Sequence, residues 1–469
     1  MSKRLLRADD IDRTVLLALH DDSQPTLEAA LTAHARTGVV LCADATTCSE
    51  AIGQAALITG VVTAVRAFGN VVVLAAVPEA PIAAGVFRGL TIADAIAREG
   101  ARAVAAHDLE GLADGWPVVL FGAETPIPEV FGTRVRPRTI LRASWSAWMA
   151  KVHASTAPAT EPRTGSCCAL AAVAAGAMGI SEAFGSLRAR PGSDAGFRTV
   201  ALNLWDPGGD TGDHGPALGY APLAWWLVGL GHLGQAYCWV ISWLTYLEPS
   251  AVEVVLQDTD RTTPANHSTG VLTPEGSDGV YKTRLAAEAL EHAGFTTRIL
   301  ERRLGPDLRA APSECHVALL GVDNLPTRVL TSDVRWLFAV DVGLGSGADN
   351  FSSLLLRRFP GAKRSDEITP WTEASQSPVG VRTSAAFTNL EKRYEVCGVV
   401  ELAGKAVGAS FVGIAAACIA VAEVARELHG GKALDVLTLD LSSWDSASAT
   451  ATPTANVISA ELLVPAAQS

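Results

Sequence analysis

The fold of the second half of the chain is decided by Trp226-Leu227-Val228-Gly229-Leu230-Gly231-His232-Leu233-Gly234. An apolar strand that turns on glycines into a helix binds phosphate, because backbone N–H groups and the helix dipole both face the anion. A second apolar run begins at Val252 and ends on Asp258-Thr259-Asp260. An acid at the end of that strand is placed to bind a ribose hydroxyl. The stretch therefore predicts a nucleotide site, with expected contacts from Gly229, Gly231, Gly234, Asp258 and Asp260.

Strand and helix patterns alternate around this motif. Strands are expected at Ala224 to Gly229, Val252 to Asp258, Thr296 to Glu301, Val317 to Val322 and Leu337 to Val342, with helices at Leu233 to Leu247 and Gly279 to Ala293. Such alternation predicts an α/β fold with a doubly wound, mainly parallel sheet. The length of 469 residues suggests more than one domain.

A separate α/β domain is expected in residues 1–150, and its role is not evident from its residues. Its predicted strands are Arg13 to His20, Gly38 to Asp44, Asn70 to Val77 and Pro117 to Gly122, and its predicted helices are Thr26 to Arg36, Ser49 to Phe68 and Ile92 to Glu99. Residues 151–220 are expected to hold a linker, a helix and a Gly/Pro-rich strap, and residues 221–445 the nucleotide-binding domain. The tail, 446–469, is expected to be partly flexible.

Composition excludes several classes of protein. Hydrophobic residues make up 49% and charged residues 18% of the chain, so a packed core is expected. The net charge of -12 argues against a general affinity for nucleic acid or for anionic membranes. The first twelve residues are charged and carry no secretory signal, so a cytoplasmic location is expected. Two apolar stretches, Cys168 to Ile180 and Ala406 to Ala422, are rich in Ala and Gly and are expected to be buried core helices.

The eight cysteines form no C-x-x-C pair. Their scatter suits neither a disulfide framework nor a zinc site, so no structural zinc is predicted. Most are expected to be buried, Cys418 among them. Cys397 differs, because it follows a long polar segment at about 360–397 and precedes a glycine. A thiol exposed there would be placed for nucleophilic attack, and a buried thiol is an equally good interpretation.

Polar residues at the expected strand ends favour ATP over NAD. Asn266 and Lys282 can orient and neutralise phosphate oxygens, Asp323 can hold Mg²⁺, and Asn324 beside it is expected to contact the nucleotide. Hydride transfer would instead need a proton-transfer residue, for which His232 and His267 are poorly placed. Each residue also has an ordinary interpretation: Asp258 as a turn cap, Lys282 as a solvated side chain, and Asp323-Asn324 as a helix N-cap.

With these motifs the chain resembles the ThiF/MoeB-type superfamily of ubiquitin-activating-like adenylyltransferases over residues 221–430. The residues that carry the resemblance are the glycine loop, the Asp258-x-Asp260 pair, Asn266, Lys282, Asp323-Asn324 with Arg328, and Cys397-Gly398 with Gly404, Gly408 and Gly413. The resemblance implies a ThiF-type nucleotide-binding fold, in which the segment 360–397 is a crossover loop. It also implies a homodimer that binds ATP and Mg²⁺ and adenylates the C-terminal carboxylate of a ubiquitin-like or sulfur-carrier protein or peptide.

The resemblance also implies roles for single residues. Asp258 becomes the ribose ligand, Asn266 and Lys282 the phosphate contacts, Asp323 the catalytic magnesium-site acid, and Cys397 the residue that captures the activated substrate. Thr269 stands where the family usually has an arginine. Possible substitutes are Arg261 and Arg284, and possible donors from a partner subunit are Arg188 and Arg190.

Two alternatives stay open. A nicotinamide- or flavin-dependent oxidoreductase would also use a glycine loop, and a nucleotide-binding scaffold that has lost turnover is consistent with the missing arginine. In the adenylation hypothesis the substrate is expected to end in glycine, because a narrow tail can reach the α-phosphate. The last residues of this chain, Val464 to Ser469, have no such tail. The carboxylate is therefore expected to come from a partner.

Overall fold

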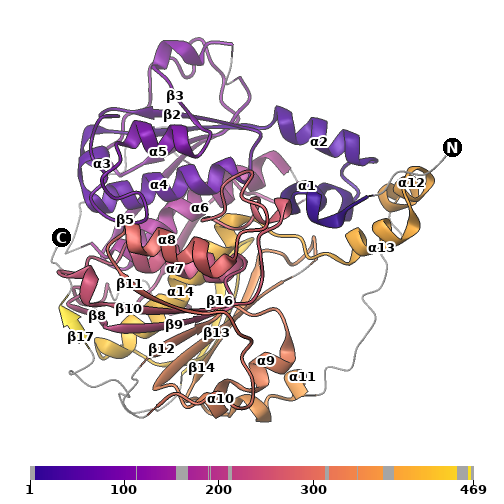
Figure 1. Cartoon of the computed structure of the whole chain (residues 1–469). Coiled ribbons are helices and arrows are strands. Elements are labelled where there is room, and N and C mark those ends of the chain that lie inside the picture. The colour runs from indigo at the N-terminus through magenta and orange to yellow at the C-terminus, as the bar shows by residue number, and fades with distance from the viewer. Residues whose placement is uncertain are drawn as a thin grey trace.

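The computed structural model contains two large β-sheets with helices between them (Figure 1). It describes residues 6–111, 114–154, 167–188, 190, 192–209, 214–311, 316–345, 347–372, 385–451 and 463–465. The mixed α/β fold with mainly parallel sheets confirms the fold class that the sequence predicts.

The second sheet, built from residues 224–451, carries the glycine motif. Its strand order is β11-β10-β9-β12-β13-β14-β15-β16, and the first five strands are parallel. The strands are β9 (Ala224–Val228), β10 (Glu253–Gln257), β11 (Thr296–Leu300), β12 (Val317–Leu320), β13 (Phe338–Leu344), β14 (Ser353–Phe359), β15 (Leu434–Asp440) and β16 (Ser443–Ala451). The helices are α7 (His232–Ser242), α8 (Lys282–His292), α9 (Leu325–Val329), α10 (Thr331–Val334), α11 (Thr369–Thr372), α12 (Ala385–Arg393), α13 (Val396–Gly404) and α14 (Ser410–Leu428).

The first sheet repeats this topology. Its order is β3-β2-β1-β4-β5-β6-β7, with five parallel strands followed by two antiparallel ones. The strands are β1 (Gly38–Ala43), β2 (Asn70–Ala75), β3 (Arg102–Ala103), β4 (Val118–Phe121), β5 (Ile140–Ser146), β6 (Met149–Ala154) and β7 (Thr199–Asn203). The helices are α1 (Arg13–His20), α2 (Leu27–Arg36), α3 (Ala45–Ser49), α4 (Ala51–Val65), α5 (Ile92–Arg98) and α6 (Ala169–Arg188). We call residues 38–204 the first module and residues 221–451 the second module.

The domain boundaries stay a prediction, but the segment 151–220 contributes regular structure to the first sheet. Strand β6 runs to Ala154, and β7 pairs with it. A short additional sheet joins β8 (Tyr220–Pro222) to β17 (Leu463–Pro465) near the end of the chain. Part of the expected flexible tail, residues 446–451, belongs to β16, and residues 452–462 and 466–469 lie outside the described part.

One prediction for the N-terminus is wrong. Arg13 to His20 was expected to be a buried strand and forms helix α1. A short apolar run does not distinguish the two, since both a buried strand and a buried helix bring apolar residues together. The three leucines and one alanine of this segment favour the helix, because these residues lose little side-chain freedom there.

Four buried helices, α4, α6, α7 and α14, lie between the two sheets (Figure 1). Among the described helices, α6 is long and apolar enough to cross a membrane, yet most of it is buried in the protein. It packs against α4 and α14. A Cβ on Gly176 of α6 would come within 2.5 Å of the carbonyl oxygen of Ala56 on α4. The small residues thus allow a close helix crossing, and the expected core helices are confirmed.

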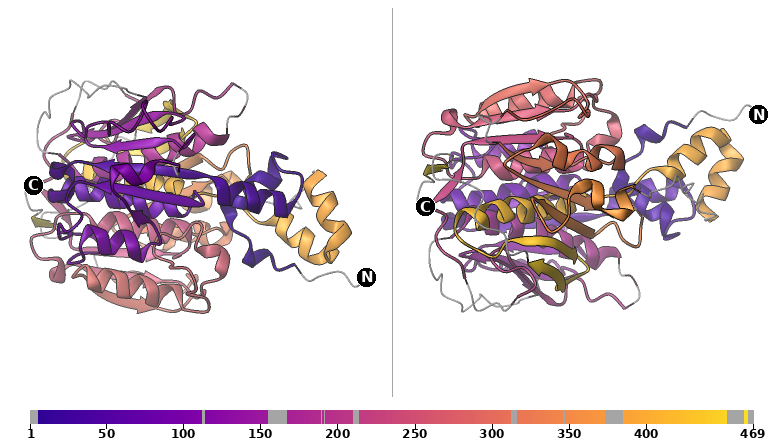
Figure 2. Two further views of the ribbon diagram at one scale, coloured as in Figure 1. Left: turned by 90° about the horizontal axis from the view of Figure 1, so that it is seen from above. Right: turned by 90° about the horizontal axis from the view of Figure 1, so that it is seen from below.

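A smaller apolar cluster lies to one side of the two modules. Helices α1 and α2 pack there with α12 and α13, although the two pairs are far apart in the sequence. Figure 2 shows this group projecting from the body of the protein at the end where the N-terminus lies. The cluster joins the N-terminus to the segment that was expected to form the crossover loop.

Candidate nucleotide-binding site

The glycine loop follows β9 and opens α7, as the sequence predicts. Gly229 has φ of +80°, which favours glycine, and a Cβ on Gly234 would lie 2.0 Å from the carbonyl oxygen of Gly229. Gly231 is the N-cap of α7 and has no side chain to bond the first turn. A Cβ added at Gly231 would meet nothing within 4 Å. The loop is therefore tight at two glycines and open at the third, where the free N–H groups of α7 can hold an anion.

Asp258 holds the glycine loop against the end of β10. Its Oδ2 accepts from the Leu230 N–H at 2.5 Å, and its Oδ1 accepts from the Asp260 N–H at 2.8 Å. The registers pair Gln257, Val228 and Leu320, so the three strands end side by side. The turn-cap interpretation of Asp258 is thus part of its role. Its carboxylate also lies at the edge where a ribose would sit.

Lys282 and Asp260 form an ion pair beside the loop. The Lys282 Nζ lies 3.2 Å from the Asp260 Oδ2, and the lysine side chain is 11% exposed whereas the aspartate is 61% exposed. Lys282 is the first residue of α8, so its position is fixed by that helix. Two groups predicted from spacing alone are therefore in direct contact.

Asn266 lies in a short 3-10 turn, Pro264–Asn266, within the loop that connects β10 to α8. Its Oδ1 accepts from the Thr263 N–H at 2.9 Å, and its backbone carbonyl accepts from the Gly270 N–H at 2.7 Å. Thr269 is buried, and its side chain carries no charge, so this position supplies no cation. The loop is held by its own hydrogen bonds, and Gly270 sets the end of the turn that carries Asn266.

Asp323 and Asn324 follow β12 and are exposed. The Asn324 Oδ1 accepts from the Thr327 N–H at 3.0 Å and caps α9, which is the ordinary interpretation of this pair. Asp258 follows β10 and Asp323 follows β12, the two strands that pair with β9 on either side of it, so both acids follow strands that neighbour the glycine loop. An exposed carboxylate there fits Mg²⁺, which is usually bound through one or two carboxylates and the phosphates of its nucleotide.

Arg328 is hydrogen-bonded to the backbone at the ends of β12 and β13, next to Asp323. It donates to the carbonyl oxygens of Val322 and Val342 and lies 3.4 Å from the carboxylate of Asp341. Burial raises the pKa of Asp341 to about 6, with Arg328 opposing this effect. The arginine thus fixes the turn before Asp323 and is not aimed at a ligand.

The two histidines of this region are structural. The Nε2 of His232 is enclosed, its ring lies against Gly408 and Gly413, and burial lowers its pKa to about 4. The Nδ1 of His267 is hydrogen-bonded to the carbonyl oxygen of Thr273 at 3.0 Å. Neither is arranged as a general base for hydride chemistry.

The arginines considered as substitutes are engaged elsewhere. Arg261 lies 3.7 Å above the ring centroid of Tyr281, and Arg284 pairs with Glu301 at 3.1 Å. Arg188 and Arg190 both pair with Asp21. For Cys397, the structure places the backbone in the first turn of α13, but its side chain lies outside the described part, so its role stays a prediction.

Two arginines that the sequence did not reveal contact the loop of Asn266. The backbone N–H of Arg13 donates to the Ser268 Oγ at 2.9 Å, and its own Nη1 is buried without a partner among the described residues. Arg66 donates to three carbonyls of the loop. Both come from the N-terminal part, about 200 residues or more before the loop, so no local motif signals them.

Comparison with known proteins identifies the family. Residues 38–204 match the BilD N-terminal domain, and residues 221–431 match the BilD C-terminal domain. A curated relative, the "Bacterial E1-like protein BilD" of Collimonas sp. (strain OK412), is 35% identical over 330 residues, which cover 69% of this chain and 68% of the relative. The chain belongs to the BilD family. The sequence resemblance is thereby confirmed at the level of E1-like proteins, and each module matches one BilD domain.

Solved structures give more distant likenesses. The E. coli MccB crystal structure matches 49% of this chain and 62% of its own length, at 12% identity and a TM-score of 0.33. The structure of E. coli MccB with ATP matches 50% of this chain and 65% of its own length, at 12% identity and a TM-score of 0.33. The structure of PaaA matches 49% of this chain and 64% of its own length, at 13% identity and a TM-score of 0.33. This chain thus matches slightly less than two thirds of these proteins. At such scores the likenesses assign no ligand to it.

Proposed function

We propose that this protein is an ATP-dependent adenylyltransferase that activates the C-terminal carboxylate of a ubiquitin-like or sulfur-carrier protein or peptide. The observation that carries the proposal is the open N-terminus of α7 at Gly231, beside which Asp258 accepts from the Leu230 N–H of the glycine loop. Asp323 follows β12, which pairs with β9 on the side opposite β10. Membership in a family of E1-like proteins supports the same class of reaction.

The chemistry fits the charges at this edge. A substrate carboxylate oxygen attacks the α-phosphorus of ATP; the new O–P bond forms, the bond to the β-phosphate oxygen breaks, and pyrophosphate leaves. The free N–H groups of α7 and the Lys282 ammonium stabilise the charge that develops on the phosphate oxygens. Asp258 orients the ribose, and Asn266 and Lys282 position the phosphates. Mg²⁺, held through Asp323, would neutralise the leaving pyrophosphate.

Several parts of the proposal extend beyond the site. Asp260 and Asn324 act by holding Lys282 and the turn after Asp323. Capture of the acyl group by Cys397 would be a second step, in which the thiolate attacks the acyl carbon and AMP leaves. A partner that ends in glycine, a homodimer and a cytoplasmic location complete the proposal.

An ATP–pyrophosphate exchange assay tests the adenylation step. The substrate would be a small protein ending in glycine that is encoded beside this chain, and the control is the same protein without its last residue. We expect exchange that depends on Mg²⁺ and on the terminal glycine. A protein that binds MgATP but shows no exchange with such partners would instead be a nucleotide-binding scaffold. A thioester that persists in Cys397→Ala would remove the capture step alone.

A further inference from the structure

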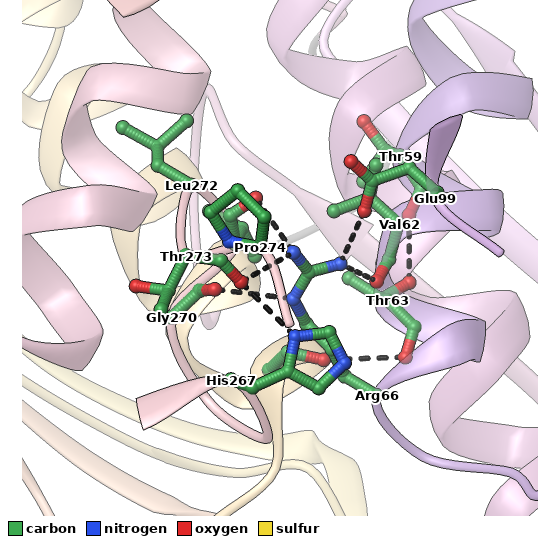
Figure 3. Close-up of polar contacts among 12 residues, drawn as sticks. Thr59, Val62, Thr63, Arg66, Glu99, His267, Gly270, Leu272, Thr273 and Pro274 are labelled. Atoms are coloured by element: carbon green, nitrogen blue, oxygen red, sulfur yellow. Dashed lines mark hydrogen bonds and ion pairs between the residues drawn. The ribbon is translucent and has the colours of Figure 1, made fainter. Parts of the chain in front are cut away.

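We infer that Arg66 of the first module is a positioning residue for nucleotide binding in the second module. This inference rests on the proposed function and gives the first module a task in it. Arg66 follows helix α4, and its side chain crosses the boundary between the modules to the loop that carries Asn266. Figure 3 shows the guanidinium lying between that loop on one side and Val62 and Glu99 on the other.

Every N–H group of the guanidinium is used. The Nε donates to the Gly270 carbonyl at 3.1 Å, and the Nη2 donates to the carbonyls of Val271 at 3.1 Å and Thr273 at 3.4 Å. The Nη1 donates to the Val62 carbonyl at 2.8 Å and to the Glu99 Oε2 at 2.7 Å. Arg66 is 3% exposed. An arginine has five such donors in a fixed plane, so one side chain fixes three carbonyls of the loop at once.

The loop passes this restraint to Asn266 through one residue. The Gly270 carbonyl accepts a hydrogen bond from Arg66, and the Gly270 N–H donates to the carbonyl of Asn266. There is little room for another arrangement, since a Cβ on Gly270 would lie 2.6 Å from the Gln235 Oε1. The turn of Asn266 is therefore held from its far end by the first module.

A second path reaches the glycine loop. The Oε1 of Gln235, on α7, accepts from the Leu272 N–H at 2.9 Å and from the Thr273 Oγ1 at 3.0 Å. Its Nε2 donates to the carbonyl of Leu230 at 3.4 Å. The segment 270–273 is thus clamped between Arg66 of one module and Gln235 of the phosphate-binding helix. Loss of Arg66 would loosen both segments that face the nucleotide.

Helix α1 adds to the clamp at its other end. The Thr14 Oγ1 donates to the carbonyl of Arg66 at 3.0 Å, and the Arg13 N–H donates to the Ser268 Oγ at 2.9 Å. Arg66 and the turn of Asn266 are therefore tied to the same short helix. These contacts place residues of the N-terminal part around the binding loop without bringing a side chain to the ligand.

The test compares two Arg66 variants with two variants at the module boundary. Arg66→Gln removes most of the carbonyl contacts, and Arg66→Lys keeps the charge opposite Glu99 and is the milder change. Thr59→Val and Ser410→Ala each remove one hydrogen bond between the modules. The bonds join Trp239 Nε1 to Thr59 Oγ1 and Ser410 Oγ to the Thr63 carbonyl, and neither involves residues 262–273. The measurements are the Kd for MgATP by calorimetry and hydrogen exchange of residues 262–273 without nucleotide.

We expect both Arg66 variants to raise the Kd for MgATP about tenfold, because the turn of Asn266 is no longer held in its binding position, and to speed exchange in 262–273. Lysine should not rescue, because it cannot reach three carbonyls at once. The two boundary variants should lower the melting temperature and leave the Kd unchanged. An Arg66→Lys protein that binds MgATP as the wild type does would overturn the inference, whereas a wild type that binds no MgATP would overturn the proposed function first.

Discussion

The first helix after β1 and the first helix after β9 begin at equivalent places in the two modules, but the two helices differ in their N-caps. In the first module, α3 begins after β1, and the Asp44 Oδ1 caps it by accepting from the Thr47 N–H at 2.7 Å. In the second module, α7 begins after β9 at Gly231 and has no side-chain cap. The same strand order therefore leaves the first turn of the helix without a side-chain cap in the second module alone, and we propose that an anion binds there.

The residues around the two helix N-termini also differ, because they are neutral hydroxyls in the first module and charged side chains in the second. In the first module, hydroxyls fill the space at the strand ends, where the Asp44 N–H donates to the Thr125 Oγ1 and the Thr47 Oγ1 donates to the Phe121 carbonyl. In the second module the corresponding edge carries Asp258, Lys282 and Asp323. Arg66 of the first module donates to the loop of the second module that carries Asn266, for which we propose a role in nucleotide binding.

The largest expected effect comes from closing the open helix end. Gly231→Asp would give α7 the cap that α3 already has, and its carboxylate would occupy the phosphate position and repel the anion. We expect MgATP affinity to fall by more than about a hundredfold, which corresponds to about 2.7 kcal/mol, in calorimetric titrations of a folded protein. Gly231→Ala adds no cap and should bind within a few-fold of wild type. An aspartate variant with wild-type affinity would place the nucleotide elsewhere.

Removing the cation of the second module should have the next largest effect. For Lys282→Ala we expect MgATP to bind about tenfold to a hundredfold more weakly, as for the loss of a hydrogen bond between charged groups. The same calorimetric titration measures it. Lys432→Ala is the matched control, because Lys432 forms an exposed pair with Asp206 at 3.1 Å, outside the site. Equal affinities of the two variants would show that Lys282 is only a solvated helix residue.

A pH dependence should distinguish α7 from α3, since α7 begins with His232, whose ring Nε2 is buried, whereas α3 begins with Ala45. Burial lowers the pKa of His232 to about 4, below the ordinary value of about 6.5. The unfolded chain therefore binds the proton first, and the stability due to neutral His232 is present above pH 6.5 and lost as the pH falls towards 4. Between pH 7.5 and 5.5 this amounts to about 1 kcal/mol.

The measurement is urea unfolding of wild type and His232→Gln at both pH values. The variant should lose about 1 kcal/mol less than wild type on acidification. The buried Asp341, whose pKa is raised to about 6, acts in the opposite direction in both proteins and cancels in the difference. Parallel losses in the two proteins would show that His232 is already accessible to protons in the folded state.

The smallest effect is expected from the cap of the first module. Asp44→Ala should lower the free energy of unfolding by about 1 kcal/mol, the usual cost of losing an N-cap, and leave MgATP affinity unchanged. Asp44→Asn keeps a capping oxygen and should be close to wild type. Chemical unfolding and calorimetry of the three proteins check both parts. A change in nucleotide affinity in Asp44→Ala alone would mean that the N-terminus of α3 also takes part in binding.

Much of the second module could be predicted because its signals are local. The glycine loop, the acids that end β10 and the lysine that begins α8 each lie at a boundary between an apolar run and a polar segment. The last three strands of its sheet, β14, β15 and β16, were not predicted. Their antiparallel pairing mixes polar and apolar residues, as in Arg357 and Arg358 of β14, and such strands lack a continuous apolar run.

What the sequence could not supply were contacts between distant segments. Arg66 meets the carbonyls of residues 270–273 more than 200 residues later, and its neighbours in the sequence give no hint of a polar task. For Asn324 the local sequence pattern is present but fits two interpretations, a nucleotide contact and the N-cap of α9. The structure shows the N-cap. Topology likewise revealed the repeat of the two modules, which share no motif.

The central claim is that the open end of α7 binds MgATP, and a thermal-shift titration of the wild-type protein tests it most directly. ATP and NAD⁺ would each be titrated with and without Mg²⁺, with Gly231→Asp as the closed-site control. We expect MgATP to raise the melting temperature of the wild type, NAD⁺ to leave it unchanged, and the variant to lose the response to MgATP. Stabilisation by NAD⁺ alone, indifferent to Mg²⁺, would contradict it and favour an oxidoreductase.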